Sequence, residues 1–356
     1  MSLPRYKVTW KTLLLPIIGL AAFFIYIYFF VDFNEIIEAI QRINLFYYVL
    51  ATIVSLLDVF FFALAWYFLL RFLSVKISIM KSFAFVWLGI FVDTLIPGES
   101  ISGEVAKIYL VNREVEGTGG QATASVVAQR LIGMGINIVT LLVGASLLLI
   151  GSLLSGIMLG MTLLLVAMIC VFFALVLLLS FKEAWTLRIV DGVINFIERI
   201  SRGRWKLTPI RGEVAEMHKA FHVAIKAYLH APRTLLIASS FSVISWLFSM
   251  SVLYLTLLSI GYVQISWSAI LVISGIFVGI KSVPIGIPFE VGLPEFTLTA
   301  LLYSFSVPKG VSETATILMR LLTLWLRFFI GFGVQQWIGV KAIITGSDTE
   351  TGSTLD

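Results

Sequence analysis

Long apolar runs separated by short polar segments dominate the hydrophobic pattern of this chain. A helix needs roughly 20 apolar residues to cross a hydrocarbon core, and runs of this length or more lie near 10–31, 45–70, 121–150, 153–181, 233–261 and 312–343. Two further apolar stretches are each broken in the middle, at 79–96 followed by 103–112 and at 267–287 followed by 293–306. Irregular backbone at membrane depth is tolerated only inside protein or around a water-filled cavity. The pattern therefore predicts six spans and two re-entrant pairs of half-helices.

The composition excludes a water-soluble protein. Of the 356 residues, 59% are hydrophobic and only 13% are charged, and the mean hydropathy is +1.02. A soluble core cannot hide that much apolar surface, so the predicted fold class is an all-α polytopic membrane protein. We expect one membrane domain at 1–345 and a disordered tail at 346–356. The single Cys170 excludes an intramolecular disulfide.

Charges in the short loops predict the topology. Basic residues precede the first span, and Lys and Arg outnumber Asp and Glu in the linker at 182–232, so both segments are expected in the cytoplasm of a prokaryotic cell. Both can lie there only if 79–112 enters and leaves the membrane on one side. The result is an inverted repeat, with unit one at about 45–150 and unit two at about 233–343. Both termini are then cytoplasmic, at the plasma membrane.

The two breaks carry nearly the same motif. Residues 97–104 read PGESISGE and residues 288–295 read PFEVGLPE. Each motif is followed, about 25 residues after its second Glu, by a lone arginine in an apolar segment, and these are Arg130 and Arg320. Broken helices with ionisable groups in corresponding places of two halves indicate a transporter's binding site.

Embedded charges supply the candidate chemistry, because each costs on the order of 3 kcal/mol near the centre of a span. We predict substrate binding by Glu99, Glu104, Lys107, Arg130, Lys281, Glu290, Glu295 and Arg320, and ion or proton coupling by Asp58 and Asp93. Arginines suit phosphates through their bidentate fork, whereas carboxylates suit a lipid amine or a proton. The alternative is structural, with ion pairs Glu104–Arg130 and Glu295–Arg320 that pin each hairpin to the next helix.

Three weaker signals have open interpretations. Asp58 is either a counter-ion for Lys281 or a proton carrier. Arg327 follows Arg320 by two α-helical turns, so it either extends a basic track on the same face or reaches toward the membrane surface. The side chains of His218 and His222 stand four residues apart, but no further ligand has suitable spacing. We therefore predict a solvated helix face there and no metal.

The linker at 182–232 has apolar residues at helical spacing from Leu187 to Ile200. This spacing predicts an amphipathic helix on the cytoplasmic membrane surface. The basic residues that follow favour anionic lipid headgroups as partners. No feature indicates nucleic acid or a cofactor.

Several motifs resemble one known family. GEVAKIYL at 103–110, AQRL at 128–131, GLPE at 292–295 and MRLLTLW at 319–325 are similar to the lysylphosphatidylglycerol synthase transmembrane region, over roughly 10–343. This resemblance implies translocation of lipids with polar headgroups. Phe289 and Glu290 stand where the family usually has glycines. The soluble aminoacyl-transferase domain of some members is absent, so we expect no synthesis of lysyl lipid by this chain alone.

The predicted function is a lipid translocase rather than an enzyme. It would move a polar-headgroup phospholipid or a polyprenyl-phosphate-linked lipid between leaflets by alternating access. The alternatives are a membrane-embedded transferase acting on polyprenyl-phosphate lipids, and a noncatalytic membrane partner of a glycosyltransferase. Further candidate partners are a second copy of the chain, as a homodimer, and a separate lipid-modifying enzyme.

Overall fold

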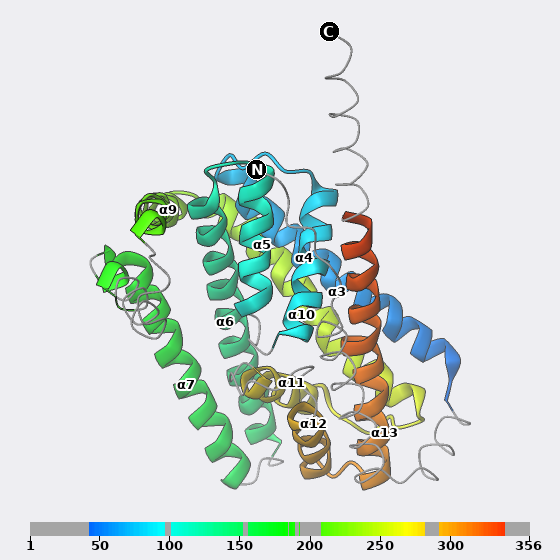
Figure 1. Cartoon of the computed structure of the whole chain (residues 1–356). Helices are drawn as coiled ribbons and strands as arrows, with labels where there is room; N and C mark the ends of the chain where they lie inside the picture. The colour runs from blue at the N-terminus through cyan, green and yellow to red at the C-terminus, as the bar shows by residue number, and fades with distance from the viewer. Residues whose placement is uncertain are drawn as a thin grey trace, which may run out of the picture.

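The computed structural model describes residues 43–96, 101–151, 156–183, 185–188, 192, 208–281 and 292–338. Every regular element in these ranges is a helix (Figure 1). The helices are α3 (Leu45–Phe72), α4 (Ile79–Leu95), α5 (Ile101–Glu114), α6 (Gly119–Ile150), α7 (Gly156–Phe181), α9 (Thr208–Leu229), α10 (Pro232–Ser259), α11 (Trp267–Lys281), α12 (Leu293–Ser304) and α13 (Lys309–Arg320). A π-helical turn at Leu321–Leu326 continues α13, and the helix runs on to Ile338.

Several predictions fall outside the described residues. These are the first span at 10–31, Glu99 and Glu290 of the two motifs, most of the amphipathic segment at 187–200, and the tail at 346–356.

Five of the described helices are long and apolar enough to cross a membrane: Leu45–Phe72, Gly119–Ile150, Leu159–Phe181, Pro232–Ser259 and Lys309–Ile338. They coincide with five of the six predicted spans. An uninterrupted apolar run can satisfy all its backbone hydrogen bonds only as a helix once water is excluded. The prediction of an all-helical membrane protein is confirmed for this part of the chain.

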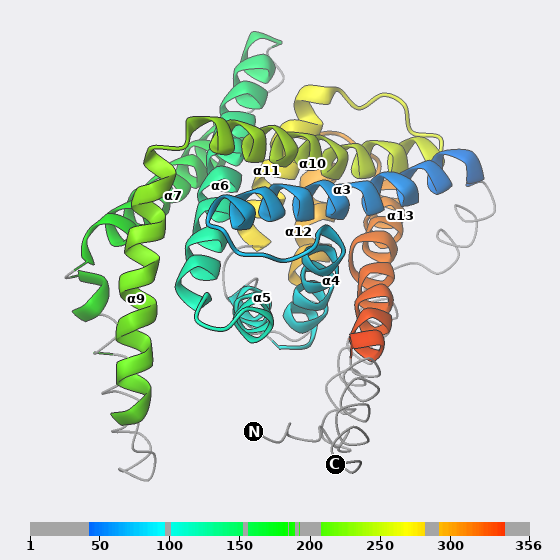
Figure 2. The ribbon, with the colours of Figure 1, turned by 90° about the horizontal axis from the view of Figure 1, so that it is seen from above.

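Helices α3 and α10 form an antiparallel pair along one side of the helix bundle (Figure 2). The backbone N–H of Asn44, just before α3, donates to the carbonyl of Ser259 at the end of α10, at 2.7 Å. Fourteen residues further along α3, Asp58 accepts a hydrogen bond from Ser245, fourteen residues back along α10. The Asn44 side chain also caps α3 by accepting from the N–H of Phe46. Helices α4, α6, α9, α11 and α13 pack against this pair.

Helices α4 and α5 form an antiparallel hairpin. The Ser78 side chain caps α4, and an ion pair between Lys81 and Glu114 joins the two helices at their open end. The helices touch closely at Gly103, where a Cβ atom would overlap the carbonyl oxygen of Gly89. Glycine is required at Gly103 because the backbone of α4 occupies the space that a side chain would need.

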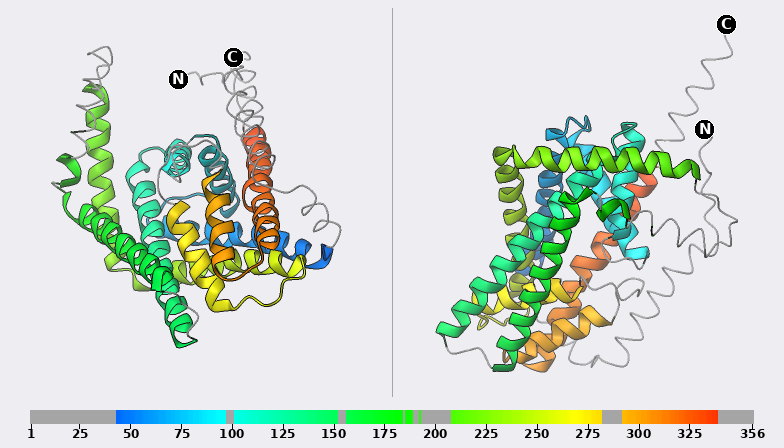
Figure 3. Two further views of the ribbon diagram at one scale, coloured as in Figure 1. Left: turned by 90° about the horizontal axis from the view of Figure 1, so that it is seen from below. Right: turned by 90° about the vertical axis from the view of Figure 1, so that its left-hand side faces the viewer.

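Helices α11 and α12 form the second interrupted segment. Gly292 lies immediately before α12 with a φ of +100°, a conformation that glycine adopts without steric cost, and Pro294 follows in the first turn. Helix α12 packs against α13, where the hydroxyl of Thr299 donates to that of Thr316 at 3.0 Å. In Figure 1 the connection from α12 to α13 lies at the end of the bundle opposite to the connection from α5 to α6. Figure 3 shows α11, α12 and α13 close together from below.

Helix α9 packs across the start of α6 instead of presenting a solvated face. His218 and His222 are both buried, with their Nε2 atoms 3.1 Å apart. The prediction of a solvated histidine face is therefore wrong. Gly120 of α6 lets α9 approach so closely that a Cβ atom there would overlap Ala220 of α9. His222 itself lies beside the end of α7, where it hydrogen-bonds to the backbone of Ser180. Burial lowers the pKa of His222 below its ordinary value, and the adjacent His218 adds to this effect.

Candidate functional site

Glu104 and Arg130 form a partly exposed ion pair between α5 and α6. Arg130 Nη1 lies 2.9 Å from Glu104 Oε2, and each side chain is 24% exposed. Glu104 belongs to the first turn of α5, directly after the break in the α4–α5 hairpin. The predicted pairing of the first motif with its arginine is present, and both partners remain open to a ligand.

Lys107 lies one turn after Glu104 and is buried. Its Nζ atom stands over the rings of Trp66, at 5.0 Å from the centroid, and Phe62, at 5.4 Å. The Trp66 ring is itself fixed, because its indole N–H donates to the hydroxyl of Ser125 at 2.9 Å. An ammonium group over an aromatic face gains cation–π attraction that partly offsets its desolvation. Lys107 therefore places a basic group one turn from the accessible ion pair.

Asp93 holds the start of α5. Its Oδ1 atom accepts from the N–H of Gly103 at 2.6 Å and from the hydroxyl of Ser102 at 2.7 Å. A carboxylate at a helix N-terminus is stabilised by the free N–H groups and the helix dipole. The residue predicted to couple ions is thus placed where it fixes the hairpin that carries Glu104.

The second motif forms a closed counterpart. Arg320 Nε lies 2.5 Å from Glu295 Oε1, and the side chains are 2% and 0% exposed. The other oxygen of Glu295 accepts from the N–H of Gly292 at 2.7 Å, which ties the pair to the start of α12. The second predicted pairing is also present. In contrast to Glu104–Arg130, this pair has no surface that a ligand can reach.

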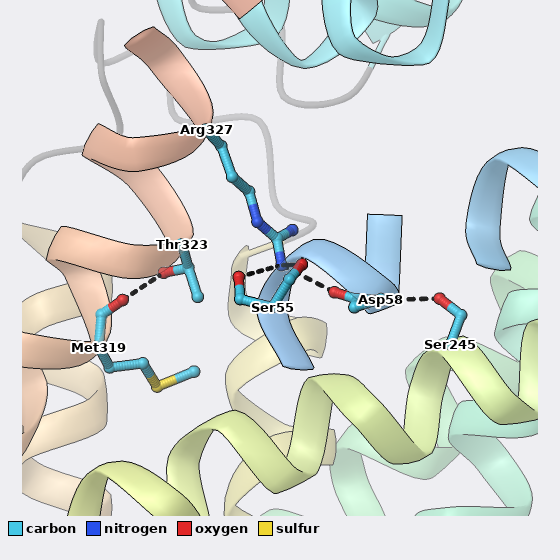
Figure 4. Close-up of polar contacts among 6 residues, drawn as sticks. All are labelled: Ser55, Asp58, Ser245, Met319, Thr323 and Arg327. Atoms are coloured by element: carbon cyan, nitrogen blue, oxygen red, sulfur yellow. Dashed lines mark hydrogen bonds and ion pairs between the residues drawn. The ribbon is translucent and has the colours of Figure 1, made fainter. Parts of the chain in front are cut away.

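A third ion pair connects α3 to the helix that continues α13, just after the π-helical turn (Figure 4). Arg327 Nη2 lies 2.7 Å from Asp58 Oδ2, and the same nitrogen approaches the hydroxyl of Ser55 at 3.2 Å. Ser245 of α10 donates to Asp58 Oδ1 at 2.6 Å. The ion-pair partner of Asp58 in the structure is thus Arg327. The sequence suggests Lys281 as a candidate counter-ion, and that residue lies in the last turn of α11. Asp58 and Arg327 were each visible as embedded charges, but no spacing signal links residues so far apart.

The π-helical turn explains why Arg327 does not follow the face of Arg320. Seven residues of α-helix return a side chain to nearly the same face, whereas one π-type insertion moves it by about 100°. The turn at Leu321–Leu326 lies between the two arginines. Arg320 accordingly contacts α12, whereas Arg327 contacts α3. Of the two interpretations that the sequence leaves open for Arg327, the basic track on one face does not agree with these contacts.

The described residues thus bring the candidate charges together in three groups. The first holds Asp93, Glu104, Lys107 and Arg130; the second holds Glu295 and Arg320; the third holds Asp58 and Arg327. The first holds the most ionisable groups and has the most exposed ion pair of the three. Guanidinium and ammonium groups of this kind bind phosphates, and a carboxylate beside them binds an amine or a proton. No group of three or more His, Cys, Asp or Glu side chains suited to a metal occurs within the described ranges.

Relatives are found among archaeal membrane proteins. A UPF0104 membrane protein of Pyrococcus horikoshii is 23% identical to this chain, over 95% of this chain and 100% of its own length. A UPF0104 membrane protein of Methanocaldococcus jannaschii is also 23% identical, over 92% of this chain and 95% of its own length. A UPF0104 membrane protein of Methanothermobacter thermautotrophicus is 24% identical over 86% of this chain and 89% of its own length.

A family model supplies the assignment that the motifs suggested. The model described as the lysylphosphatidylglycerol synthase TM region matches residues 16–331. The match includes both hairpin motifs, both motif arginines and the Asp58–Arg327 pair. The chain is an integral membrane protein that belongs to the lysylphosphatidylglycerol synthase transmembrane-region family.

Proposed function

We propose that this protein moves a lipid with a phosphate-containing headgroup between membrane leaflets by alternating access. The observation that carries the proposal is the unequal exposure of two corresponding ion pairs. The side chains of Glu104 and Arg130 are each 24% exposed, whereas those of Glu295 and Arg320 are buried. In alternating access one half of a site is open while the other is closed. The described conformation has this asymmetry.

Correspondence between the two halves supports the proposal. Helices α3 and α10 are both 28 residues long. Each is followed by a pair of shorter helices and then by a long helix, α6 or α13 with its extension, that carries the motif arginine. We infer an inverted repeat, with the α4–α5 hairpin entering from the cytoplasm and the α11–α12 hairpin from outside.

The contact between Asp58 and Ser245 also supports this symmetry. Each is the fourteenth residue of its helix, α3 or α10, and the two helices are antiparallel. Equivalent positions touch one another only where a twofold axis passes between them. An axis there lies perpendicular to the helix pair, as an inverted repeat requires, and gives the halves a common pivot.

The accessible group has the chemistry that a headgroup needs. Arg130 can exchange Glu104 for a phosphate oxygen, because its planar fork fits both anions. Lys107, whose Nζ atom lies over the rings of Trp66 and Phe62, supplies a second basic group in the same cluster. Glu104, once released, can hold a lipid amine or a proton. The carboxylate therefore occupies the anion site when no lipid is bound.

Transport in liposomes tests this function. Purified protein should accelerate the transfer of fluorescent phosphatidylglycerol between leaflets, measured by quenching with a membrane-impermeant reductant. We expect Arg130→Ala and Glu104→Gln each to slow transfer by about tenfold or more, which corresponds to about 1.4 kcal/mol in the barrier. Lys81→Gln is the matched control, because it removes an ion pair at the open end of the same hairpin.

The proposal fails if the wild-type protein does not accelerate transfer. It also fails if the Arg130 and Glu104 variants transport as well as Lys81→Gln does, because the accessible charges would then be structural. Size-exclusion profiles of the variants confirm that each remains folded.

A further inference from the structure

Only one of the three nitrogen atoms of the Arg327 guanidinium makes hydrogen bonds within the described residues. All of its contacts within the described residues pass through Nη2, to Asp58 and to the hydroxyl and carbonyl oxygens of Ser55. Nε is buried without a hydrogen-bond partner there. A buried donor without a partner is costly and marks a place where another group can bind. The side chain is 17% exposed, so Nη1, with its two N–H donors, is the part of the fork still open to a ligand.

Asp58 is held more firmly than Arg327. One of its oxygens accepts from Ser245 at 2.6 Å and the other contacts Arg327 at 2.7 Å. Asp58 therefore stays at the crossing of α3 and α10 even if the arginine leaves. The Asp58 carboxylate is also the one charged group that Arg327 contacts in the described part of the chain. The arginine is the movable member of the pair.

The backbone around Arg327 is adapted to this position. The hydroxyl of Tyr48 donates to the carbonyl of Leu318 at 3.2 Å, and that of Thr323 donates to the carbonyl of Met319 at 2.9 Å. Side-chain donors thus serve two carbonyl groups just before the π-helical turn that directs Arg327 toward α3. Turns of this kind occur frequently at functional sites.

We propose that Arg327 is a binding site for the phosphate group of an anionic phospholipid, and that Asp58 is a built-in competitor for the same guanidinium. Both edges of an arginine fork include Nη2, so a phosphate can bind in bidentate fashion only by sharing or displacing the Asp58 contact. This site lies on a different helix face from Arg320 and belongs to neither hairpin motif. The choice of a lipid as the source of the phosphate rests on the proposed function.

Lipid binding to the purified protein in detergent tests the inference. The probes are short-chain phosphatidylglycerol, a diacylglycerol that lacks phosphate, and inorganic phosphate alone. Asp58→Asn keeps an acceptor for Ser245 but removes the competing charge, so it should raise the affinity for phosphatidylglycerol roughly tenfold. Arg327→Gln should abolish that gain in the Asp58→Asn background. Ser251→Ala is the control for a polar change on the same helix, because its exposed hydroxyl bonds only the carbonyl of Leu247 among the described residues, and it should leave the affinity within about twofold of wild type.

A lysine at position 327 tests the role of the guanidinium fork. Arg327→Lys keeps the charge without the fork and should lose most of the affinity, which separates bidentate binding from simple attraction. The inference is overturned if Asp58→Asn leaves the affinity unchanged or lowers it, or if the diacylglycerol shows the same gain. Inorganic phosphate binding as tightly as phosphatidylglycerol would overturn the lipid assignment. Asp58→Asn combined with Arg130→Ala should still show the gain without transport, so failure of this site and failure of transport are distinguishable.

Discussion

Removing one partner of the Glu295–Arg320 pair should destabilise the protein far more than removing one partner of Glu104–Arg130. Arg320 and Glu295 are 2% and 0% exposed, so Glu295→Gln or Arg320→Met leaves the other charge without compensation in a low-dielectric interior. Breaking a buried pair in this way costs about 3–5 kcal/mol. Glu104→Gln leaves a partner that retains contact with solvent, so its cost should be about 1 kcal/mol.

The free energy of unfolding, measured by titration with a denaturing detergent, gives both numbers. The double variant Glu295→Gln/Arg320→Met should be less destabilised than either single variant, because no unpaired charge remains. The reasoning is refuted if the single substitutions at the two ion pairs cost the same. Additive effects of Glu295→Gln and Arg320→Met would refute it too, because the buried pair would then have no interaction energy.

Two further changes have clear expected outcomes. Gly103→Ala places a methyl group against the backbone of Gly89 and should destabilise the hairpin by about 1–3 kcal/mol. Gly135→Ala is the control, because its methyl group meets no packed neighbour within 4 Å and should not destabilise the protein in this way. The free energies of unfolding of the two variants test this difference. Burial lowers the pKa of His222 in the folded state, so the folded protein favours the neutral imidazole. This contribution to stability is present above pH 6.5, the ordinary pKa of histidine, and should be lost as the pH falls through the lowered pKa of the folded state. Thermal unfolding should thus be more sensitive to acid in the wild type than in His222→Gln, and equal sensitivity would contradict the assignment.

The architecture could be predicted largely from residue patterns. Uninterrupted apolar runs dictate spans because lipid leaves no other way to satisfy the backbone, and the Pro and Gly residues at the two breaks marked the ends of α4, α5 and α12. The two motif ion pairs followed from repeated spacing. These features depend on local sequence, and the sequence alone therefore predicts them.

Other features depend on packing between distant segments. Arg327 leaves the expected face because of a π-helical turn, which is a matter of backbone hydrogen bonding that the apolar sequence of 321–326 does not encode visibly. The Asp58–Arg327 pair joins the first described helix to the last. His222 is buried beside the end of α7, where it hydrogen-bonds to the backbone of Ser180, a contact between segments about 40 residues apart. Tertiary contacts of this kind decide which of several plausible partners a charge adopts.

Alternating access by two oppositely oriented halves requires that the two hairpins enter the membrane from opposite sides. Single cysteines at Lys81, Gly117, Ser266 and Lys309, in a background with Cys170 replaced by serine, report this orientation because all four positions have exposed surface. With a membrane-impermeant maleimide, positions 81 and 117 should react only from the cytoplasmic side, and positions 266 and 309 only from outside. Reaction of 81 and 117 from opposite sides would show that α4–α5 crosses the membrane, and would contradict both the inverted repeat and the transport mechanism built on it.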